Sequence, residues 1–306
     1  MSPTITLDPP LTAPRMVRSS SLNGALVKLL DEMRGRKIAA LLNHGHRGDG
    51  ISLLGGGQLL ASLGLKCRCF FESDDLSRME GDVLLVYGAG PLARESRAFR
   101  RGLSTITNRF AEVVILPTSF DVDAPAVRDF SETWNRKFTV FCRELVSLDA
   151  LRELRTSAKA LLLGHDLAFH LDVSPWAARH GQGRAGIFRC DRDAAYDRVP
   201  RDFDAREDAA LGPEREPGPL LDFISRFSEI HTDRSPAAIA AALMGRKVVF
   251  YRNRNFRNQA VYDHSLAGTT NVTFARRSAF SFVQFVRAHF RPRPHRHQFK
   301  SRYALE

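Results

Sequence analysis

The sequence predicts an α/β protein built from two Rossmann-like domains, and three observations lead to this fold class. Six short apolar runs alternate with helix-forming stretches up to about residue 175, which is typical of a doubly wound parallel sheet. A stretch at 176–184 contains two glycines and predicts a hinge. A second strand–helix–strand pattern begins at residue 186 and predicts a smaller second domain with three or four strands.

The elements follow from short apolar runs and from helical spacing of apolar residues. In the first domain we expect strands at 37–42, 65–71, 82–87, 113–116, 138–142 and 160–163, with helices at 22–33, 51–63 and 94–106. In the second domain we expect strands at 186–190 and 247–251, a strand that ends at 230–233, and helices at 220–227 and 237–244. The charged, Pro/Gly-rich residues 197–219 predict a surface loop.

These elements divide the chain into four parts. Residues 1–20 are expected to be a flexible leader, 21–180 the first Rossmann-like domain and 181–272 the smaller second one. Residues 273–306 are expected to form a C-terminal helix and a basic tail. The apolar spacing in 274–290 predicts that this helix packs back across both domains. A helix that lies on a membrane surface is the alternative.

The composition and the charge of the chain argue against some classes of protein. The 306 residues contain no apolar run of the length that a membrane span needs, and the N-terminus has no apolar signal core, so we expect a cytoplasmic protein. The net charge of +11 suits nucleic acid, anionic lipid or phosphorylated substrates. We find no nucleic-acid recognition motif, which argues against nucleic acid. The four cysteines lack zinc-site spacing and are expected to be reduced, with no metal bound.

Candidate ligand contacts follow the predicted strands of the first domain, because sites in parallel sheets lie at the carboxyl ends of the strands. A glycine-rich turn after the first strand carries Gly45, Gly48 and Asp49, and Gly88 and Gly90 follow the third strand. The first turn matches neither a Walker loop nor a dinucleotide fingerprint. A plain tight turn is its alternative.

The later strands of the first domain are followed by polar candidates, which are Ser119, Arg143, Glu144, Ser147 and Asp166. An arginine at such a position can hold a phosphate or carboxylate through two hydrogen bonds. Arg143 could instead order its own loop, and Asp166 could contact a ligand or cap a helix.

The stretch 231–267 holds the second set of candidates. Asp233 and Arg234 precede a helix of small residues, and an arginine- and asparagine-rich loop that includes Asn255 follows the next strand. Helix N-termini and arginine side chains both favour anionic ligands.

Several of these motifs occur in one order that resembles the polysaccharide pyruvyl transferase family, over roughly residues 38–267. The matching segments are Gly45-x-x-Gly48-Asp49, Gly88-x-Gly90, Pro117-x-Ser119, Arg143-Glu144-x-x-Ser147, Asp166-x-Ala168-Phe169, Phe188-Arg189-x-Asp191, Thr232-Asp233-Arg234 and Val261-Tyr262-x-x-Ser265-Leu266. The resemblance implies a GT-B-like pair of domains. It also implies transfer of a pyruvyl group from phosphoenolpyruvate, without a further cofactor, to a sugar hydroxyl of an exopolysaccharide or cell-surface glycan precursor.

The resemblance implies roles for these residues. Arg143 and Arg234 would hold phosphoenolpyruvate with help from Arg189, while Asp49 and Ser119 would meet a lipid-linked or oligosaccharide acceptor. Where the family reads Arg-Leu-His, this chain reads Arg234-Ser235-Pro236, so the family's acid histidine is replaced by a proline. His231 is a candidate replacement, and His44 is another.

Two alternatives to a pyruvyl transferase stay open. The first is a GT-B glycosyltransferase whose basic loop at 252–257 binds the diphosphate of a nucleotide sugar. The second is a catalytically inactive binding protein of the same fold. In the pyruvyl transferase hypothesis, the basic surface and tail also suit peripheral contact with the inner face of the plasma membrane.

Overall fold

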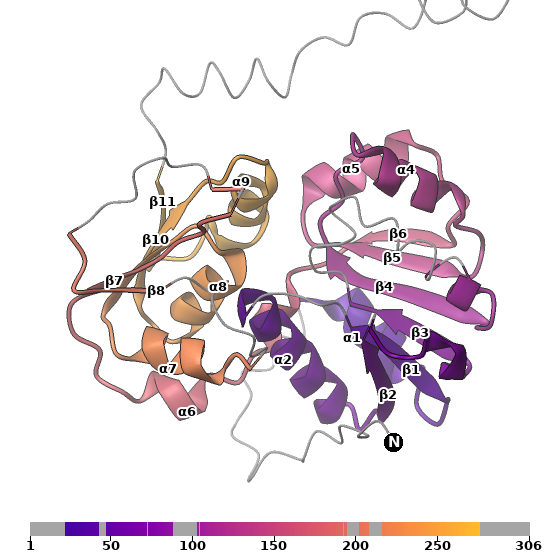
Figure 1. The fold of residues 1–306 in the computed structure, drawn as a ribbon, viewed down its shortest axis with the longest axis horizontal. Helices are drawn as coiled ribbons and strands as arrows, with labels where there is room; N and C mark the ends of the chain where they lie inside the picture. Colours follow the sequence, from indigo (N-terminus) through magenta and orange to yellow (C-terminus); the bar gives the residue numbers. More distant parts are fainter. Residues whose placement is uncertain are drawn as a thin grey trace, which may run out of the picture. The chain divides into compact units, whose positions relative to one another are not determined.

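The computed structural model describes residues 22–42, 47–71, 73–87, 103, 105–191, 193–194, 202–207 and 216–275. The described strands form two sheets, coloured indigo to magenta and pink to yellow in Figure 1. The first sheet has six strands in the order β2-β1-β3-β4-β5-β6, and the second has five in the order β11-β10-β9-β7-β8. This confirms the prediction of an α/β protein with two sheets whose strands alternate with helices, an arrangement compatible with two Rossmann-like domains.

The first sheet is parallel at every pairing from β2 to β6. Its strands are β1 (Ile38–Leu42), β2 (Cys67–Phe71), β3 (Val83–Val86), β4 (Glu112–Thr118), β5 (Phe138–Cys142) and β6 (Ala160–Leu163). The helical elements around it are α1 (Gly24–Asp31), α2 (Arg47–Ser62), η1 (Leu76–Arg78), α4 (Pro125–Glu132), α5 (Leu145–Glu153) and η3 (Leu167–His170), whereas α6 (Ser174–Ala177) packs through Trp176 against the core of the second sheet.

Helices cover both faces of this sheet. Alternate residues of each strand point to opposite faces, so each strand contributes side chains to both cores. Ala39 and Leu41 of β1 pack with residues of α4 and α5, including Phe130. Ala40, between them in the sequence, packs on the other face with residues of α1 and α2, including Leu30. Burial on both faces explains why these strands are continuous apolar runs rather than alternating ones.

The second sheet is parallel at β8-β7, β7-β9 and β9-β10. Its strands are β7 (Arg184–Ile187), β8 (Ala205–Glu207), β9 (Glu229–Thr232), β10 (Lys247–Tyr251) and β11 (Val272–Ala275). The helices of this region are α7 (Gly218–Ser225), α8 (Ser235–Leu243), α9 (Arg257–Val261) and the π-helix η4 (Tyr262–Leu266). Alanines of α8 pack with Ile230 and Val248 in one apolar core.

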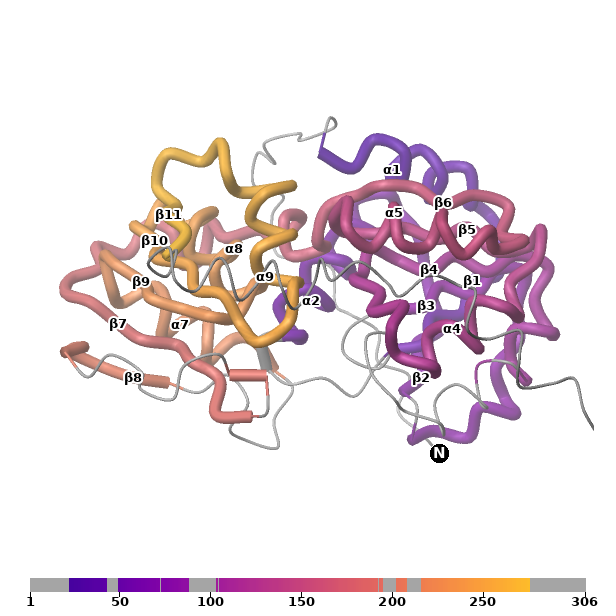
Figure 2. The backbone as a smooth tube through the Cα atoms, turned by 90° about the horizontal axis from the view of Figure 1, so that it is seen from above, coloured from indigo at the N-terminus to yellow at the C-terminus, as the bar shows by residue number. Residues whose placement is uncertain are grey.

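Helix α2 contributes to the cores of both sheets. Ile51 near its start packs in the core of the second sheet, and Leu59 and Leu60 near its end pack in the core of the first. The helix also contacts η3 and α8, and it can be followed in the tube of Figure 2. The contacts within the chain accordingly group both sheets in one unit, Met1–Phe274.

Three expectations about the second sheet are wrong. It has five strands rather than three or four. One of the additional strands, β8, lies within the stretch 197–219 that we expected to be a surface loop, and it contains only three residues. Phe274 belongs to β11 and not to the start of a helix, and its ring packs against Phe250 of β10. The rest of the expected C-terminal helix lies outside the described residues, as does most of the helix expected at 94–106.

The close packing of α2 on η3 gives a stability prediction. A Cβ atom on Gly55 would collide with the backbone carbonyl oxygen of Leu167, which cannot move away without shifting η3. We expect Gly55→Ala to lower the free energy of unfolding by about 1–3 kcal/mol, the usual cost of overpacking. Gly24→Ala in α1 is the control, because nothing lies within 4 Å of its added carbon. Its expected effect is a gain of about 0.4–1 kcal/mol. Urea denaturation of both variants checks this, and an unchanged Gly55→Ala would contradict the packing.

Candidate functional site

The first polar group lies at the carboxyl ends of three neighbouring strands of the six-stranded sheet. We call it the Arg143 group, and it consists of Ser119 after β4, Arg143 after β5, Asp166 after β6 and Ser52 of α2. Nε of Arg143 donates to Ser119 at 2.9 Å, and Nη1 donates to Asp166 at 2.6 Å. Ser52 donates to the same carboxylate at 2.7 Å. The strand order therefore brings together three residues that the sequence predicted separately.

Asp166 performs the capping role that the sequence left as one of two alternatives. Its Oδ1 accepts from the backbone N–H of Ala168 at 2.9 Å, which caps η3. Its Oδ2 accepts from Arg143, and the Asp166 side chain is only 2% exposed. A buried carboxylate with these donors orients the guanidinium of Arg143 firmly. A ligand contact at either residue stays a prediction.

Glu144 and Ser147 build the start of α5. The Glu144 side chain accepts from the backbone N–H of Ser147 at 2.9 Å and also from the Ser147 hydroxyl. The Ser147 hydroxyl oxygen in turn accepts from the N–H of Phe120 at 2.7 Å. Both residues are fully buried, so these contacts join α5 to the loop after β4. Their expected contact with a substrate stays a prediction.

The glycine-rich turn is described only in part. Gly48 and Asp49 lie in the first turn of α2, where the negative charge of a carboxylate interacts favourably with the positive end of the helix dipole. Gly45, Gly88, Gly90 and His44 lie outside the described residues.

The second polar group lies at the carboxyl ends of β7, β9 and β10, which are neighbours in the five-stranded sheet. We call it the Arg234 group. It contains three arginines and three aspartates, which are Arg189, Asp191, Asp193, Asp233, Arg234 and Arg257. The three arginine side chains are 13%, 6% and 13% exposed in the order 189, 234 and 257. Guanidiniums with so little exposure need nearby acceptors, because desolvation of a charge is costly.

The ion pairs of the Arg234 group bridge the strands. Arg189 donates to both carboxylate oxygens of Asp191, at 2.9 and 2.8 Å. Arg257 donates to Asp193 at 3.0 Å, and Arg189 lies 3.2 Å from the same oxygen. The ion pair of Arg234 with Asp191 is longer, with 3.9 Å between Nη2 of the arginine and Oδ2 of the aspartate. The group is therefore a set of closely spaced opposite charges that follow three neighbouring strands.

Asp233 is a buried carboxyl of the Arg234 group. Burial raises its pKa to about 6, although the N–H of Arg189 and the charges of Arg234 and Arg189 oppose this rise. Its Oδ1 accepts from the N–H of Arg189 at 2.9 Å. Asn258 fixes the backbone by donating to the carbonyl oxygen of Asp233 at 2.7 Å. A carboxyl with a pKa near neutrality can hold or release a proton at physiological pH.

Asn255 lies in the loop between β10 and α9. Its Oδ1 accepts from the N–H of Arg257, the first residue of α9, at 3.1 Å. Its Nδ2 is buried, and this atom has no hydrogen-bond partner among the described residues. The predicted substrate contact of Asn255 stays a prediction.

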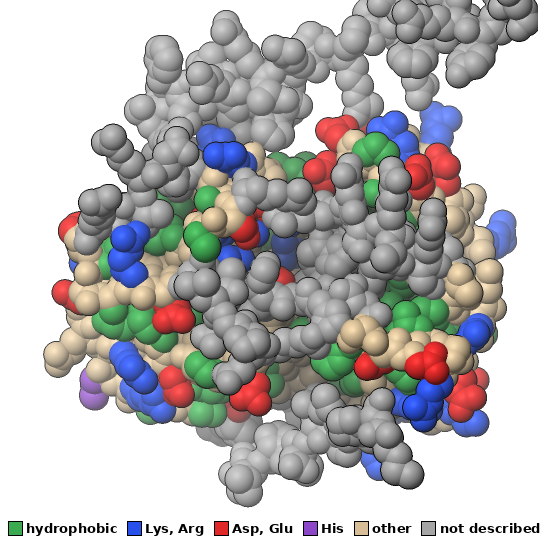
Figure 3. Space-filling model, viewed as in Figure 1, with side chains coloured by type: hydrophobic (Ala, Val, Ile, Leu, Met, Phe, Trp, Pro, Cys, Tyr) green, Lys and Arg blue, Asp and Glu red, His purple; other side chains and the backbone are tan. Residues whose placement is uncertain are grey.

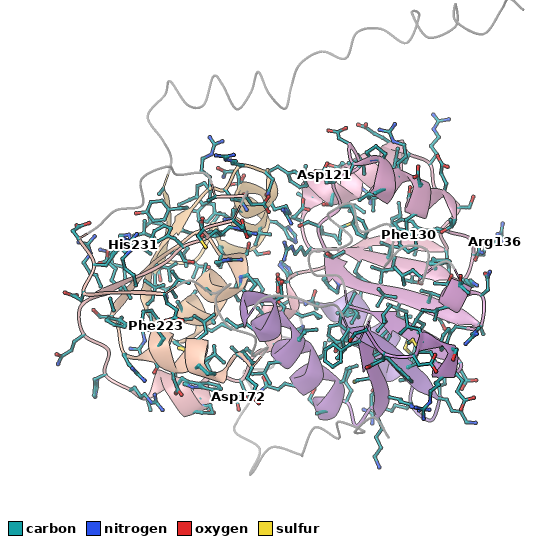
Figure 4. The ribbon with its side chains drawn as sticks, in the orientation of Figure 1. Asp121, Phe130, Arg136, Asp172, Phe223 and His231 are labelled. Carbon is teal, nitrogen blue, oxygen red and sulfur yellow. The ribbon has the colours of Figure 1, made fainter. Side chains whose placement is uncertain are left out.

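His231 belongs to a different network, among the strands of the five-stranded sheet (Figure 4). Its Nε2 lies 2.6 Å from Glu229, and its Nδ1 lies 2.9 Å from the Tyr251 hydroxyl. A carboxylate only accepts, so Nε2 donates to Glu229, and in the neutral ring Nδ1 accepts from Tyr251. Burial lowers the pKa of His231 and opposes its protonation. Its role as an acid stays a prediction.

Two further imidazoles lie beside the Arg143 group. The rings of His165 and His264 stack at a centroid distance of 4.5 Å with an interplanar angle of 10°. His165 contacts the Ser265 hydroxyl at 2.8 Å, and His264 donates to the carbonyl oxygen of Gly164 at 3.0 Å. These contacts join the loop after β6 to the π-helix η4. Burial is the main cause that lowers the pKa of His165 to about 4, so its ring is neutral at pH 7.

The sequence predicted the arginines of both groups, but it did not predict all of the side chains that form ion pairs and hydrogen bonds within these groups. Asp193 and Ser52 were not expected to belong to a site, and the charge-rich segment 189–193 was the only signal for Asp193. Within the described part of the chain, no group of three or more histidine, cysteine, aspartate or glutamate side chains is arranged to hold a metal ion. In the same part, no helix combines the length and apolarity needed to cross a bilayer.

Comparisons with known proteins bear on the fold only. No protein-family model matches the chain, and no curated protein matches it. Among solved structures, the chain is similar to a functionally uncharacterized protein from Klebsiella pneumoniae, with a TM-score of 0.65 and 23% sequence identity. The similarity covers 83% of this chain and 96% of the Klebsiella protein. The chain therefore shares its two-sheet α/β fold with a protein whose structure has been determined.

Proposed function

We propose that this protein is a transferase that binds phosphoenolpyruvate and moves its pyruvyl group to a sugar hydroxyl of a glycan precursor. The observation that carries the proposal is the Arg234 group, in which Arg189, Arg234 and Arg257 follow three adjacent parallel strands. Phosphoenolpyruvate carries a phosphate and a carboxylate, and guanidiniums bind both kinds of anion through paired hydrogen bonds. The motif resemblance adds the choice of donor.

The position of Arg234 supports a role in donor binding. Arg234 follows the middle strand of the five-stranded sheet, and its Nη2 lies 3.9 Å from Asp191, the same aspartate to which Arg189 donates two hydrogen bonds. Both guanidiniums therefore lie beside one carboxylate, and an anion bound there would meet two positive charges. Arg189 and Arg257, held by their aspartates, would contribute positive charge and fix the geometry.

The Arg143 group would contact both the donor and the acceptor sugar. Arg143 is oriented by Asp166 and Ser119, so its guanidinium is already immobilised before a ligand arrives. A preoriented donor loses less side-chain entropy on binding, which favours affinity. In this proposal Arg143 assists in binding the donor, and Ser119 and Asp49 contact the acceptor sugar. A GT-B-like arrangement of the two sheets is part of the same proposal.

The test is release of inorganic phosphate from phosphoenolpyruvate in the presence of a panel of lipid-linked and free oligosaccharides. We expect Arg234→Ala to lower this rate by at least about a hundredfold, because it removes charge-assisted hydrogen bonds to the donor. Arg152→Ala is the matched control, since this arginine is 60% exposed and pairs only at the surface of α5. Its rate should be unchanged.

The same experiment separates the competing functions. Phosphate release at an equal rate in Arg234→Ala would remove this residue from the site. Protection of the protein against thermal unfolding by a nucleotide sugar, without turnover of phosphoenolpyruvate, would indicate a glycosyltransferase instead. A circular dichroism spectrum of Arg234→Ala that matches the wild type shows that a lost rate is not a lost fold.

A second candidate is a protein that binds the anion and does not transfer it. The observation that favours it is the position of Pro236, which is buried in the first turn of α8 and has no proton to donate. His231, the candidate replacement acid, is engaged by Glu229 and Tyr251. Binding of phosphoenolpyruvate by the wild type, with no phosphate released for any acceptor, would favour this function.

The peripheral membrane contact expected from the basic charge is a weaker part of the proposal. In the view of Figure 3, basic and acidic side chains are interspersed over the described surface. The basic tail 291–302, with five lysine and arginine residues and no acidic residue, lies outside the described residues.

A further inference from the structure

The proposed reaction needs a proton donor, and the Arg234 group contains a carboxyl suited to that task. Formation of a ketal from phosphoenolpyruvate requires a proton on C3 while an acceptor oxygen bonds to C2. The proline at position 236 has no proton to offer, and the ring of His231 is engaged by Glu229 and Tyr251. We propose that Asp233 is the general acid of the reaction, an inference that rests on the proposed pyruvyl transfer.

The position of Asp233 is the first support. It follows β9, the middle strand of the five-stranded sheet, at the carboxyl end where ligands of parallel sheets bind. Its neighbours in the sequence and across the sheet are Arg234 and Arg189, the residues that we propose for binding the donor. A donor held by these arginines would lie next to the carboxyl of Asp233.

The hydrogen bonding of Asp233 is the second support, because it distinguishes the two carboxyl oxygens. Oδ1 accepts from the N–H of Arg189 at 2.9 Å. Among the described residues no hydrogen bond is made to Oδ2. An oxygen that accepts a backbone hydrogen bond stays unprotonated, so the acidic proton belongs on Oδ2.

The charges that face Asp233 agree with this role. Arg189 and Arg234 lower its pKa, and Asp191 together with burial raises it. Burial has the largest effect, so the carboxyl retains a proton closer to neutral pH than an exposed aspartate does. An acid whose pKa lies near the working pH is both protonated and able to transfer its proton.

The proposed step balances. The proton on Oδ2 of Asp233 moves to C3 of phosphoenolpyruvate, whose methylene becomes a methyl group, and the oxygen of one acceptor hydroxyl bonds to C2. The hydrogen of that hydroxyl returns to the Asp233 carboxylate. The bond from C2 to the phosphate oxygen then breaks, and a second acceptor hydroxyl bonds to C2 to complete the ketal. The hydrogen of the second hydroxyl leaves with the phosphate, so Asp233 ends in its starting form.

The test compares Asp233→Asn with the wild type in phosphoenolpyruvate binding and turnover. Asparagine keeps an oxygen that accepts from the N–H of Arg189 but has no acidic proton. We expect the affinity for phosphoenolpyruvate to change by less than about threefold and kcat to fall by about 10²–10⁴-fold, the range for loss of a general acid. In the wild type, kcat should fall tenfold per pH unit above about 6, because the acid must be protonated. Asp149→Asn, an exposed carboxyl on α5, is the control and should keep both values.

The outcomes separate this inference from the proposed function. If the wild type turns over phosphoenolpyruvate and Asp233→Asn keeps its kcat, the inference is overturned while the proposed function stands. If the wild type neither binds nor turns over phosphoenolpyruvate, both are overturned. Should Asp233→Asn fail to fold, the pH profile of the wild type decides, and a kcat that rises from pH 6 to 8 overturns the inference.

Discussion

Replacement of Arg143 by alanine is expected to lower the free energy of unfolding by about 3–5 kcal/mol, the usual cost of removing one partner of a buried ion pair. The reason is the state of Asp166, whose side chain is 2% exposed and would lose its only described ion-pair partner. Ser52 and the N–H of Ala168 would still donate to it. We therefore expect a value near the lower end of this range, measured by urea denaturation.

A double-mutant cycle tests whether the loss of stability in Arg143→Ala comes from the buried charge of Asp166. Asp166→Asn removes the charge and keeps oxygen and nitrogen atoms at the same positions. In the Asp166→Asn background, Arg143→Ala should cost at least about 1 kcal/mol less than it costs in the wild type. An equal cost in both backgrounds would contradict the ion-pair explanation and would point to lost packing. Arg152→Ala should change stability by no more than about 0.5 kcal/mol, because its pair with Asp149 is exposed.

Asp233→Asn is expected to stabilise the protein above pH 6, with a gain of up to about 3 kcal/mol. Burial raises the pKa of Asp233 from 3.8 to about 6 in the folded protein, and each pKa unit corresponds to about 1.4 kcal/mol. The folded state therefore binds this proton more tightly than the unfolded state does. The aspartate costs nothing below about pH 4, where both states are protonated, and costs most above pH 6.

The measurement is the difference in unfolding free energy between Asp233→Asn and the wild type, taken from pH 4 to pH 8. We expect it to grow with pH across the interval from 4 to 6 and to stay level above it. A difference that does not depend on pH would show that Asp233 titrates as an ordinary exposed aspartate. Asp149→Asn should show no such change, because the Asp149 side chain is 65% exposed.

The well-predicted elements share one physical property. Strands β5, β6 and β10 are continuous apolar or β-branched runs bounded by charged or polar residues, and the structure gives them the ends that the sequence predicts. Both edge strands of the second sheet were missed. Strand β8 is the three residues Ala205–Glu207, two of them charged, and carries no apolar signal. Phe274 of β11 begins a run of apolar residues in the sequence whose spacing is typical of a helix, so the sequence predicted a helix there.

The candidate site could be predicted residue by residue but not as a set of contacts. The sequence placed Ser119, Arg143 and Asp166 after strands, and the strand order then decided that they meet. Because β4, β5 and β6 are neighbours in the sheet, the three side chains reach one another. Likewise, Asp233 meets the N–H of Arg189 because β9 pairs with β7, which precedes it by more than forty residues.

The partner of His231 also depended on sheet pairing. His231 lies two residues before Asp233, so the sequence suggested that both serve one site. In the sheet, His231 lies opposite Val249 of β10 and Gly186 of β7. Its ring contacts the hydroxyl of Tyr251, the last residue of β10. It also contacts the carboxylate of Glu229, which lies two residues before His231 on β9. Such a network is set by neighbouring strands, whose order a single sequence does not contain.

In the proposed function, guanidiniums after β7, β9 and β10 bind a donor that carries both phosphate and carboxylate. Calorimetric titration of phosphoenolpyruvate into the wild type and Arg234→Ala tests it most directly. We expect binding to one site per chain and an affinity lower by at least about tenfold in the variant, the effect of a lost charge-assisted hydrogen bond. An absence of heat with the wild type at millimolar phosphoenolpyruvate, or equal affinities of the two proteins, would contradict it.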